Sequence, residues 1–296
     1  MAFFSSKTAI SSKTNTGTIC LYWTQSFKTG GFIFGGGENR RQAQEDGEKT
    51  AIIFLHGLAV RATTACKLFT GPALGLSSSM NEVRCPSGPT KSTAIFPPTM
   101  IPGAGAFIAS WFNFWLMPGL SVLSPVAGES KTDLDEALAT IEGIIEELMD
   151  EGIPSENIVL SGASQGGVLT VYTALHSKHK LGGFLPIVTW VPLLKQEPPS
   201  DLPTPVNVDT PILHLNGAQD PIVSIVPAGL KSKAALEKVF TNYEFKSRTG
   251  THTTSINPLN ILRVRRWLKK NTNINFSSLH NFVGRIPGLS SLGLGK

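Results

Sequence analysis

The chain has 296 residues, of which 41% are hydrophobic and 16% are charged, and its formal net charge is +5. This composition excludes an intrinsically disordered chain, and the length allows one large domain or two ordinary ones with a substantial core. The three cysteines are too few and too scattered for a disulfide framework, and their odd number favours a reducing compartment.

Residues 1–48 differ from the rest of the chain. They are rich in Ser, Thr, Gly and Lys and contain no acidic residue before Glu38. They lack the continuous apolar stretch of a secretory signal, whereas the depletion of acids is shared with organelle transit peptides. We interpret this segment as a flexible or targeting-like extension. We expect a cytoplasmic protein, with targeting to an organelle as the alternative.

From residue 49 onward, apolar runs alternate with helical periodicity. The run TAIIFLHG (residues 50–57) is typical of a buried parallel strand, and NEVRCP (residues 81–86) predicts a second, short strand. Residues 132–152 predict a helix with Thr132 or Ser130 as its N-cap. Further strands are expected at 157–161, 183–189, 211–215 and 243–247, and further helices at 165–177, 229–239 and 258–270.

Strands that alternate with helices predict an α/β fold with a mostly parallel central sheet and helices on both faces. We expect this domain to span residues 49–272 and to be followed by a loose C-terminal tail at 273–296. The basic stretch RVRRWLKK (residues 263–270) is interpreted as the solvated face and positive last turn of the final helix. Nucleic-acid binding is not indicated, because no recognition motif accompanies the charge.

The segment from Ser92 to Gly128 contains no charged residue. Proline and glycine interrupt it, and its continuous apolar part, FIASWFNFWLM, is too short to cross a bilayer. A transmembrane helix is therefore the weaker alternative. We expect an apolar loop that covers a hydrophobic pocket and makes transient contact with membranes.

The sequence GASQG (residues 162–166) follows the apolar run NIVLS and precedes a predicted helix. This strand-to-helix context makes the G-x-S-x-G pattern informative. Glycine fits at both ends because side chains there would collide in so tight a turn. The turn raises the Ser164 hydroxyl above the strand ends, and the Gln165 N–H would point at a developing oxyanion. The pattern predicts Ser164 as a nucleophile.

A serine nucleophile needs a base, and in this class of fold the partners follow in the order Ser, acid, His. His252 lies in a loop directly after a predicted strand, whereas His214 lies inside one and is expected to be buried. Asp220 follows a predicted strand and is the candidate acid. The Leu58 N–H, after the first strand, is the candidate second oxyanion donor. His56 is interpreted as structural.

These segments resemble the acyl-protein thioesterase and lysophospholipase/carboxylesterase family of α/β-hydrolases. The resemblance runs in the family's order from about residue 50 to 270, through the stretches IIFLHGL, SWFN, GLSVLSP, EGIPSENIVLSGASQGGVLTVYTAL, TWVPLL, HLNGAQDPIV and GTHTTS. It implies that Ser164 is the nucleophile, His252 the general base and acid, and Asp220 the group that orients the imidazole. It also implies that Leu58 and Gln165 supply the oxyanion N–H groups, and that no metal or cofactor is needed.

The resemblance implies a depalmitoylating acyl-protein thioesterase that acts on S-acylated proteins. One alternative is a lysophospholipase or carboxylesterase that cleaves lipid or small oxygen esters. The apolar acyl channel is expected to be lined by Phe112, Trp115, Trp190 and Leu193.

The chain departs from the family at two places, and the first of them favours a second alternative, a catalytically impaired relative that binds acyl chains. After Gly57 the family usually continues with Gly, Asp, Thr and Gly, whereas this chain reads AVRAT from Ala59 to Thr63. Asn113 stands where the family usually has Asp.

Overall fold

The computed structural model describes residues 48–70, 74–76, 79–92, 107–115, 128–193, 204–253 and 258–276. The predicted extension up to residue 47 and the tail beyond residue 276 lie outside these ranges. The strands are β1 (Thr50–Leu55), β2 (Asn81–Arg84), β3 (Thr90–Ser92), β4 (Phe107–Ala109), β5 (Phe114–Trp115), β6 (Gly128–Glu129), β7 (Ile158–Ala163), β8 (Gly183–Ile187), β9 (Ile212–Gly217) and β10 (Tyr243–Arg248). The helices are α2 (Ala62–Thr70), α3 (Lys131–Asp150), α4 (Gln165–His176), α5 (Leu230–Val239) and α6 (Pro258–Asn271).

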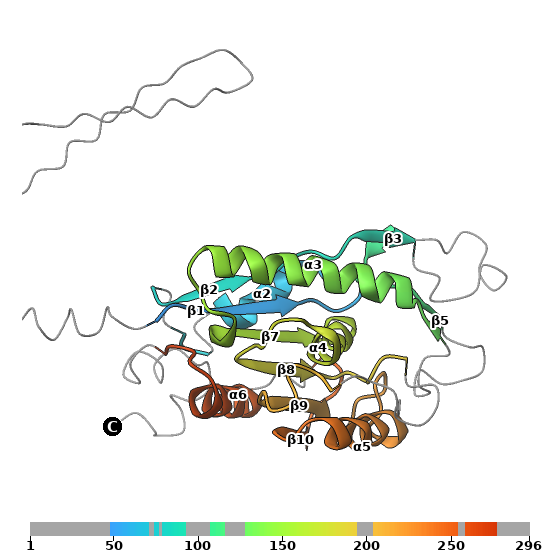
Figure 1. Ribbon diagram of the computed structural model, residues 1–296. Helices are drawn as coiled ribbons and strands as arrows, with labels where there is room; N and C mark the ends of the chain where they lie inside the picture. The colour runs from blue at the N-terminus through green and yellow to red at the C-terminus, as the bar shows by residue number, and fades with distance from the viewer. Residues whose placement is uncertain are drawn as a thin grey trace, which may run out of the picture. The chain divides into compact units, whose positions relative to one another are not determined.

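Six strands form one sheet in the order β10-β9-β8-β7-β1-β2, and all neighbouring pairs are parallel (Figure 1). Strands β1, β8 and β9 are buried along their whole length, and β7 is buried up to its last residue. Parallel strands are apolar on both sides because helices cover both faces of the sheet. The predicted parallel sheet is therefore confirmed.

Alternate residues of each strand divide the core into two clusters, because successive side chains point to opposite faces. Ile53 of β1 belongs to a cluster that it shares with residues of α3, α4 and α5. Its neighbour Ile52 belongs to the other cluster, together with Phe69 of α2 and Trp267 of α6. Helices α3, α4 and α5 thus cover one face of the sheet, and α2 and α6 cover the other.

The predicted strands and helices are present, and their ends differ from the predicted ones by one or two residues. Strand β7 runs two residues further than predicted and includes Gly162 and Ala163. Ser130, not Thr132, caps α3, because its Oγ accepts a hydrogen bond from the Asp133 N–H at 3.2 Å. The longer β7 brings the strand directly up to the predicted nucleophile.

Helix α2 and two antiparallel ribbons, β3–β4 and β5–β6, were not predicted. The sequence of α2, ATTACKLFT, contains several weak helix formers, so its propensity gives little signal. Packing holds this helix, since the Phe69 ring lies 4.9 Å from that of Phe54 in β1. The ribbon strands have only two or three residues, too few for a recognisable alternation.

Of the uncharged segment between residues 93 and 127, the structure describes residues 107–115. These residues enter the core. Trp111 and Phe112 are at most 1% exposed, and Phe114 is 8% exposed. All three belong to the cluster on the side of α3 and α4. No helix in the described ranges is both long enough and apolar enough to cross a membrane.

Cys66 of α2 and Cys85, which follows β2, form a disulfide with their Cα atoms 5.8 Å apart. A single disulfide is not the framework that the cysteine count argued against, but with two of the three cysteines joined the odd count no longer supports a reducing compartment. The sequence did not indicate the pair, because 19 residues separate the two cysteines and only the packing of α2 beside β2 brings them together.

Candidate active site

The loops at the carboxyl ends of the parallel strands carry the predicted catalytic residues. Leu58 follows β1, Ser164 follows β7, Asp220 follows β9 and His252 follows β10. In a parallel sheet these ends meet at one edge, where α/β proteins bind their ligands. The fold therefore brings residues that are far apart in sequence to one edge of the sheet.

Backbone strain is concentrated at the same edge. Among the described residues, those other than glycine with positive φ are Ala59, Ser164, Val188 and Leu193, at 58°, 55°, 46° and 58°. They follow β1, β7 and β8. Such conformations cost of order 1–3 kcal/mol each and are typical of functional sites. The strain supports this edge as the candidate site.

Close backbone contacts fix the turn at Ser164. A Cβ atom on Gly166 would lie 2.2 Å from the Leu55 carbonyl oxygen, so only glycine fits there. The Ser164 N–H donates to the Ile187 carbonyl oxygen at 2.9 Å, and the Ser164 carbonyl oxygen accepts from Thr189 Oγ1 at 3.0 Å. The backbone N–H and carbonyl groups of Ser164 are therefore both hydrogen-bonded, while Ser164 itself remains partly exposed.

Asp220 and His252 form a hydrogen-bonded pair. His252 Nδ1 lies 2.8 Å from Asp220 Oδ2. The Asp220 side chain is fully buried, and its Oδ1 accepts hydrogen bonds from the N–H groups of Ile222 and Val223 at 2.8 and 2.9 Å. Because Nδ1 donates to the carboxylate, Nε2 of the neutral ring is left as an acceptor. That is the tautomer that a general base needs.

Unused N–H groups lie next to the serine in the chain and on the neighbouring loop. The N–H groups of Leu58 and Gln165 donate to no acceptor within the part of the chain that the structure describes. The two loops touch, since a Cβ atom on Gly57 would lie 3.3 Å from Ser164 Cβ. Free N–H groups directed at a reacting carbonyl are the usual donors of an oxyanion hole.

Partners from elsewhere in the chain hold the loop after β1. His56 Nε2 accepts a hydrogen bond from the Gly88 N–H at 2.8 Å, and its Nδ1 lies 2.7 Å from the Gly57 carbonyl oxygen. Trp111 Nε1 donates to the His56 carbonyl oxygen at 2.9 Å. Burial holds the pKa of His56 below its usual value, and the hydrogen bond with Gly57 offsets only part of this effect. A neutral, buried imidazole is the structural role expected from the sequence.

The residue that replaces the family's usual glycine in this loop keeps a conformation that favours glycine. Ala59 has φ 58°, and its N–H donates to the Ala109 carbonyl oxygen at 3.0 Å. The Leu58 N–H, one residue earlier, remains without an acceptor in the described ranges. The altered sequence thus leaves that N–H available.

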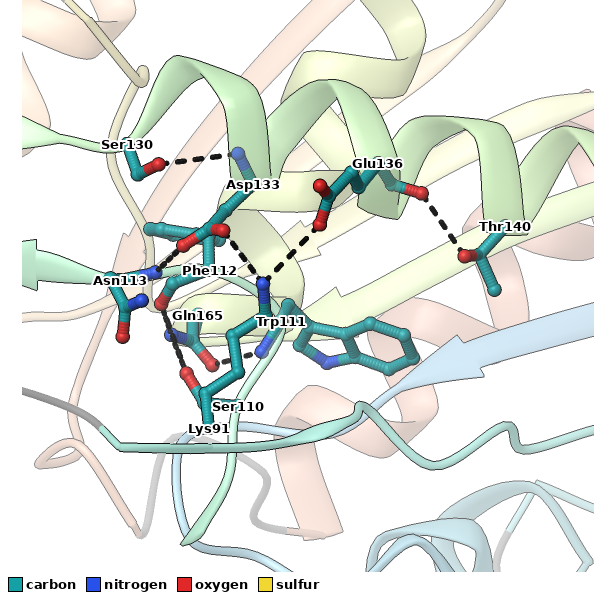
Figure 2. A network of polar contacts seen from close by, with 10 residues as sticks. All are labelled: Lys91, Ser110, Trp111, Phe112, Asn113, Ser130, Asp133, Glu136, Thr140 and Gln165. Carbon is teal, nitrogen blue, oxygen red and sulfur yellow. Dashed lines mark hydrogen bonds and ion pairs between the residues drawn. The ribbon is translucent and has the colours of Figure 1, made fainter. Parts of the chain in front are cut away.

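The side chain of Gln165, which the sequence suggested only as a backbone donor, is the centre of a buried network. Its Oε1 accepts from the Trp111 N–H at 3.0 Å, and its Nε2 donates to Ser110 Oγ at 2.9 Å and the Phe112 carbonyl oxygen at 2.7 Å (Figure 2). Gln165 therefore ties the turn at Ser164 to residues 110–112. A single glutamine gives no sequence signal for such a role.

The network continues to a largely buried ion pair. The Asn113 N–H donates to Asp133 Oδ2 at 2.8 Å, and Lys91 Nζ lies 2.7 Å from Asp133 Oδ1 (Figure 2). Burial alone would raise the pKa of Asp133, but the hydrogen bonds from Lys91 and Asn113 outweigh it and hold that pKa below its usual value. The sequence did not indicate this pair, because its members come from distant segments.

Three of the four residues expected to line an acyl channel belong to, or pack against, the core cluster on the side of α3 and α4. Phe112 is fully buried in the core there, and Trp190 is 8% exposed. Trp190 Nε1 and the Leu193 N–H both donate to the Glu129 carboxylate, at 2.8 and 3.1 Å. The side chain of Trp115 lies outside the described part of the structure. Their role in acyl binding stays a prediction.

Among the described residues, one group of possible metal ligands lies elsewhere, between α3 and the loop after α4. Glu142, Glu146 and His179 each offer a ligand atom, and these atoms lie within 4.8 Å of one another. Lys178 Nζ lies 2.5 Å from Glu146 Oε1, so an ammonium group already supplies positive charge there.

A profile of the family described as phospholipase/carboxylesterase matches residues 39–271 of the chain. Acyl-protein thioesterase 1 of Kluyveromyces lactis is 36% identical over 155 residues, which cover 51% of this chain and 65% of that protein. The protein of the same name from Saccharomyces cerevisiae is 30% identical over 214 residues, which cover 68% of this chain and 84% of that protein. Acyl-protein thioesterase 1 homolog 2 of Dictyostelium discoideum is 36% identical, over 55% of its length. The chain thus spans less than two thirds of the Kluyveromyces and Dictyostelium relatives.

Solved structures give the same fold. Arabidopsis thaliana SOBER1 is 27% identical with a TM-score of 0.61, over 75% of this chain and 99% of that chain. Zea mays acyl-protein thioesterase 2 is 20% identical with a TM-score of 0.57, over 76% of this chain and 94% of that chain, a likeness that speaks to fold alone. The predicted α/β-hydrolase fold is confirmed.

Proposed function

The chain belongs to the phospholipase/carboxylesterase family, and on this premise we propose that it is a serine hydrolase that removes long acyl chains from S-acylated proteins. The observation that carries the proposal is the buried Asp220–His252 pair at the same sheet edge as the strained turn of Ser164. Similarity to proteins named acyl-protein thioesterase 1 supports a thioester substrate.

In the first step, Ser164 Oγ forms a bond to the carbonyl carbon of the thioester while His252 Nε2 takes the hydroxyl proton. Asp220 stabilises the imidazolium that results. The carbon–sulfur bond then breaks, and the departing thiolate takes the proton from His252. The acyl group is left on Ser164 as an ester.

In the second step, water attacks this ester and gives a proton to His252. The carbon–oxygen bond to Ser164 breaks, the proton returns to the serine oxygen, and the fatty acid leaves. In both steps the carbonyl oxygen becomes an oxyanion, which the N–H groups of Leu58 and Gln165 stabilise. Both groups stand ready for this role, because neither donates to an acceptor within the described residues.

Two alternative functions have specific support. Action on lysophospholipids or small oxygen esters is favoured by the family's own description, phospholipase/carboxylesterase. A catalytically impaired relative is favoured by the altered loop after Gly57. The left-handed Ala59 and the unused Leu58 N–H weigh against impairment.

A matched pair of substrates tests the proposal. The same long acyl chain would be presented as a cysteine-peptide thioester and as a lysophospholipid ester, with Ser164→Ala as the control. We expect faster hydrolysis of the thioester, and loss of hydrolysis in the variant. A reactive-serine probe should label wild type but not Ser164→Ala.

The other outcomes decide between the alternatives. Preference for the oxygen ester would assign the protein to lipid metabolism. Folded protein that hydrolyses neither substrate and takes up no probe would refute the hydrolase proposal and favour an acyl-binding protein. If Phe112→Ala leaves the acyl-length preference unchanged, the assignment of Phe112 to the channel is wrong.

We propose a cytoplasmic site of action, with organelle targeting by residues 1–48 as the alternative. The Cys66–Cys85 disulfide counts against the cytoplasm and in favour of the alternative, since disulfides are rare in the cytosol. Imaging of the full chain fused to a fluorescent protein at its C-terminus, with and without residues 1–48, decides between the two.

A further inference from the structure

A basic pocket lies between the end of β10 and the first half of α6. Its volume is ≈ 320 Å³, at the lower end of the ~300–1,000 Å³ that ligand pockets usually have. Its lining includes three arginines, Arg248, Arg263 and Arg266, together with Thr249, Leu259 and Asn260. Among the residues that the structure describes, no acidic residue lines it.

The basic stretch of α6 divides into three parts with different surroundings. Arg265 points away from the pocket and is 8% exposed, with its Nη1 donating to the carbonyl oxygens of Leu74 and Gly75. Lys269 and Lys270 are exposed in the last turn. Arg263 and Arg266 line the pocket. The expectation of one solvated basic face is therefore wrong for Arg265 and incomplete for the two pocket arginines.

The pocket arginines lack acidic partners. Within the described ranges, none of Arg248, Arg263 and Arg266 forms an ion pair with a carboxylate. Burial lowers the pKa of Arg263, and the positive charges of Arg248 and Arg266 lower it further. Glu244 acts on Arg263 in the opposite direction, but its carboxylate is already 3.1 Å from Lys246 Nζ. Two neighbouring guanidinium groups thus repel that of Arg263 beside a concave site, and an anion would relieve that repulsion.

We propose that this pocket binds a phosphate-bearing ligand, with Arg248, Arg263 and Arg266 as its anion-binding groups. The planar guanidinium fork matches two phosphate oxygens at once, which makes arginine the usual residue at such sites. The volume admits a phosphorylated headgroup as well as a free phosphate. Leu259 on the lining is 75% exposed and could rest against the apolar boundary of a lipid layer.

The pocket lies at the same sheet edge as the candidate active site. Arg248 is the last residue of β10, and His252 follows it by four residues. A phosphate held there would sit beside the loop that carries the proposed base. This binding does not depend on the proposed hydrolysis, so Ser164→Ala should bind phosphate as well as wild type does.

The chain offers a matched control on the same helix. Arg263→Gln/Arg266→Gln and Lys269→Gln/Lys270→Gln each remove two positive charges, but only the first pair lines the pocket. Binding of inorganic phosphate and glycerol 3-phosphate is measured by calorimetry at fixed ionic strength. Binding to a bilayer is measured by co-sedimentation with phosphatidylcholine vesicles, with and without phosphatidic acid.

We expect wild type and the lysine variant to bind alike, and the arginine variant to bind at least about a hundredfold more weakly, because two charge-assisted hydrogen bonds are lost. Circular dichroism checks that the arginine variant is folded, because Arg263 also donates to Asn260 Oδ1 at 3.1 Å and the variant loses this bond. Binding in solution identifies a soluble phosphate ligand, and binding only to vesicles with phosphatidic acid identifies a lipid headgroup. Equal losses in the two variants, or no binding by wild type in either assay, would overturn the proposal.

Discussion

The two loops that meet at Ser164 are shaped in different ways. The turn after β7 is shaped by its own glycines, since a Cβ atom on Gly162 or Gly166 would lie 2.2 Å from a backbone carbonyl oxygen. The loop after β1 is instead held by Gly88 and Trp111, which bond to His56. Both loops are held by other segments, but only the first needs glycine at fixed positions to make its close contacts.

This difference explains why the turn after β7 can be recognised in the sequence as a motif, whereas the sequence only suggests the conformation of the loop after β1. Glycines at fixed spacing are needed wherever the turn after β7 occurs, so the pattern can be recognised in any sequence. The loop after β1 tolerates Ala59 in place of glycine because its conformation is enforced from outside. A departure from a family's usual sequence is therefore less damaging in a loop that its surroundings hold.

The largest expected effect on stability comes from a substitution in the turn after β7. Gly166→Ala should destabilise the protein by about 3 kcal/mol or more, because the new Cβ would meet the Leu55 carbonyl oxygen, which cannot move without shifting β1. Urea denaturation measures this. Gly143→Ala is the control: a Cβ there meets nothing within 4 Å, and in the middle of α3 it should stabilise by about 0.5–1 kcal/mol. Equal effects of the two changes would contradict the steric account.

The second prediction concerns the pH dependence of stability and a buried group that lies in neither loop. Burial lowers the pKa of His214 in β9 from 6.5 to about 4, so the folded protein keeps this ring neutral. When the pH falls below about 6.5, the unfolded state takes up a proton that the folded state does not, and stability is lost. Between about pH 7 and pH 5 the loss from this group is about 2 kcal/mol.

His214→Gln should therefore give a flatter profile of unfolding free energy against pH than wild type over this range. Equilibrium unfolding at a series of pH values is the measurement. Parallel profiles for the two proteins would mean that His214 is not the group responsible. His56, whose pKa burial also lowers, contributes in the same direction in both proteins.

Weakening the tertiary support of the loop after β1 should cost less stability and more activity. Trp111→Phe removes the hydrogen bond from Nε1 to the His56 carbonyl oxygen and should destabilise by about 1–2 kcal/mol. Because the Leu58 N–H depends on this loop, kcat should fall while KM changes little. Steady-state kinetics with a small ester measures the effect. An unchanged kcat in the destabilised variant would show that Trp111 does not position the loop.

The smallest expected effect is a gain. Ala59→Gly relieves the left-handed conformation at Ala59, but it also increases the entropy of the unfolded chain. The net stabilisation should be about 0.5 kcal/mol, visible as a small rise in the unfolding midpoint. Ala59→Val, which places a β-branched side chain at positive φ, should destabilise instead. A loss of stability in the glycine variant would mean that the Ala59 methyl group makes a favourable contact.

The fold could be predicted where hydrophobic pattern and turn chemistry agree. Strands β1, β7, β8, β9 and β10 are apolar runs or follow clear turn signals, and α3 has an amphipathic period and a cap. Helix α2 could not be predicted, because its weak formers are held by the contact of Phe69 with Phe54. The Cys66–Cys85 pair also depends on that packing.

The candidate site shows the same division. Ser164, Asp220 and His252 were predicted from chain order and from their place after strands, and the structure brings Asp220 and His252 into contact. The side chain of Gln165 and the Lys91–Asp133 pair were not predicted, since their partners come from segments with no shared pattern. The division of the basic stretch on α6 was likewise invisible, because helical spacing does not reveal which side of α6 faces a pocket.

By itself, the sequence determined the order of the strands of the main sheet and of helices α3 to α6, the glycine-built turn at Ser164 and the identity of the residues that follow these strands. These features depend on local sterics and on periods of two or 3.6 residues, which can be read from the chain. The tertiary structure alone decided which buried polar groups bond to one another, which cysteines pair, and which arginines share a pocket. Those outcomes depend on contacts between distant segments, and such contacts form only when the sheet and its helices have packed.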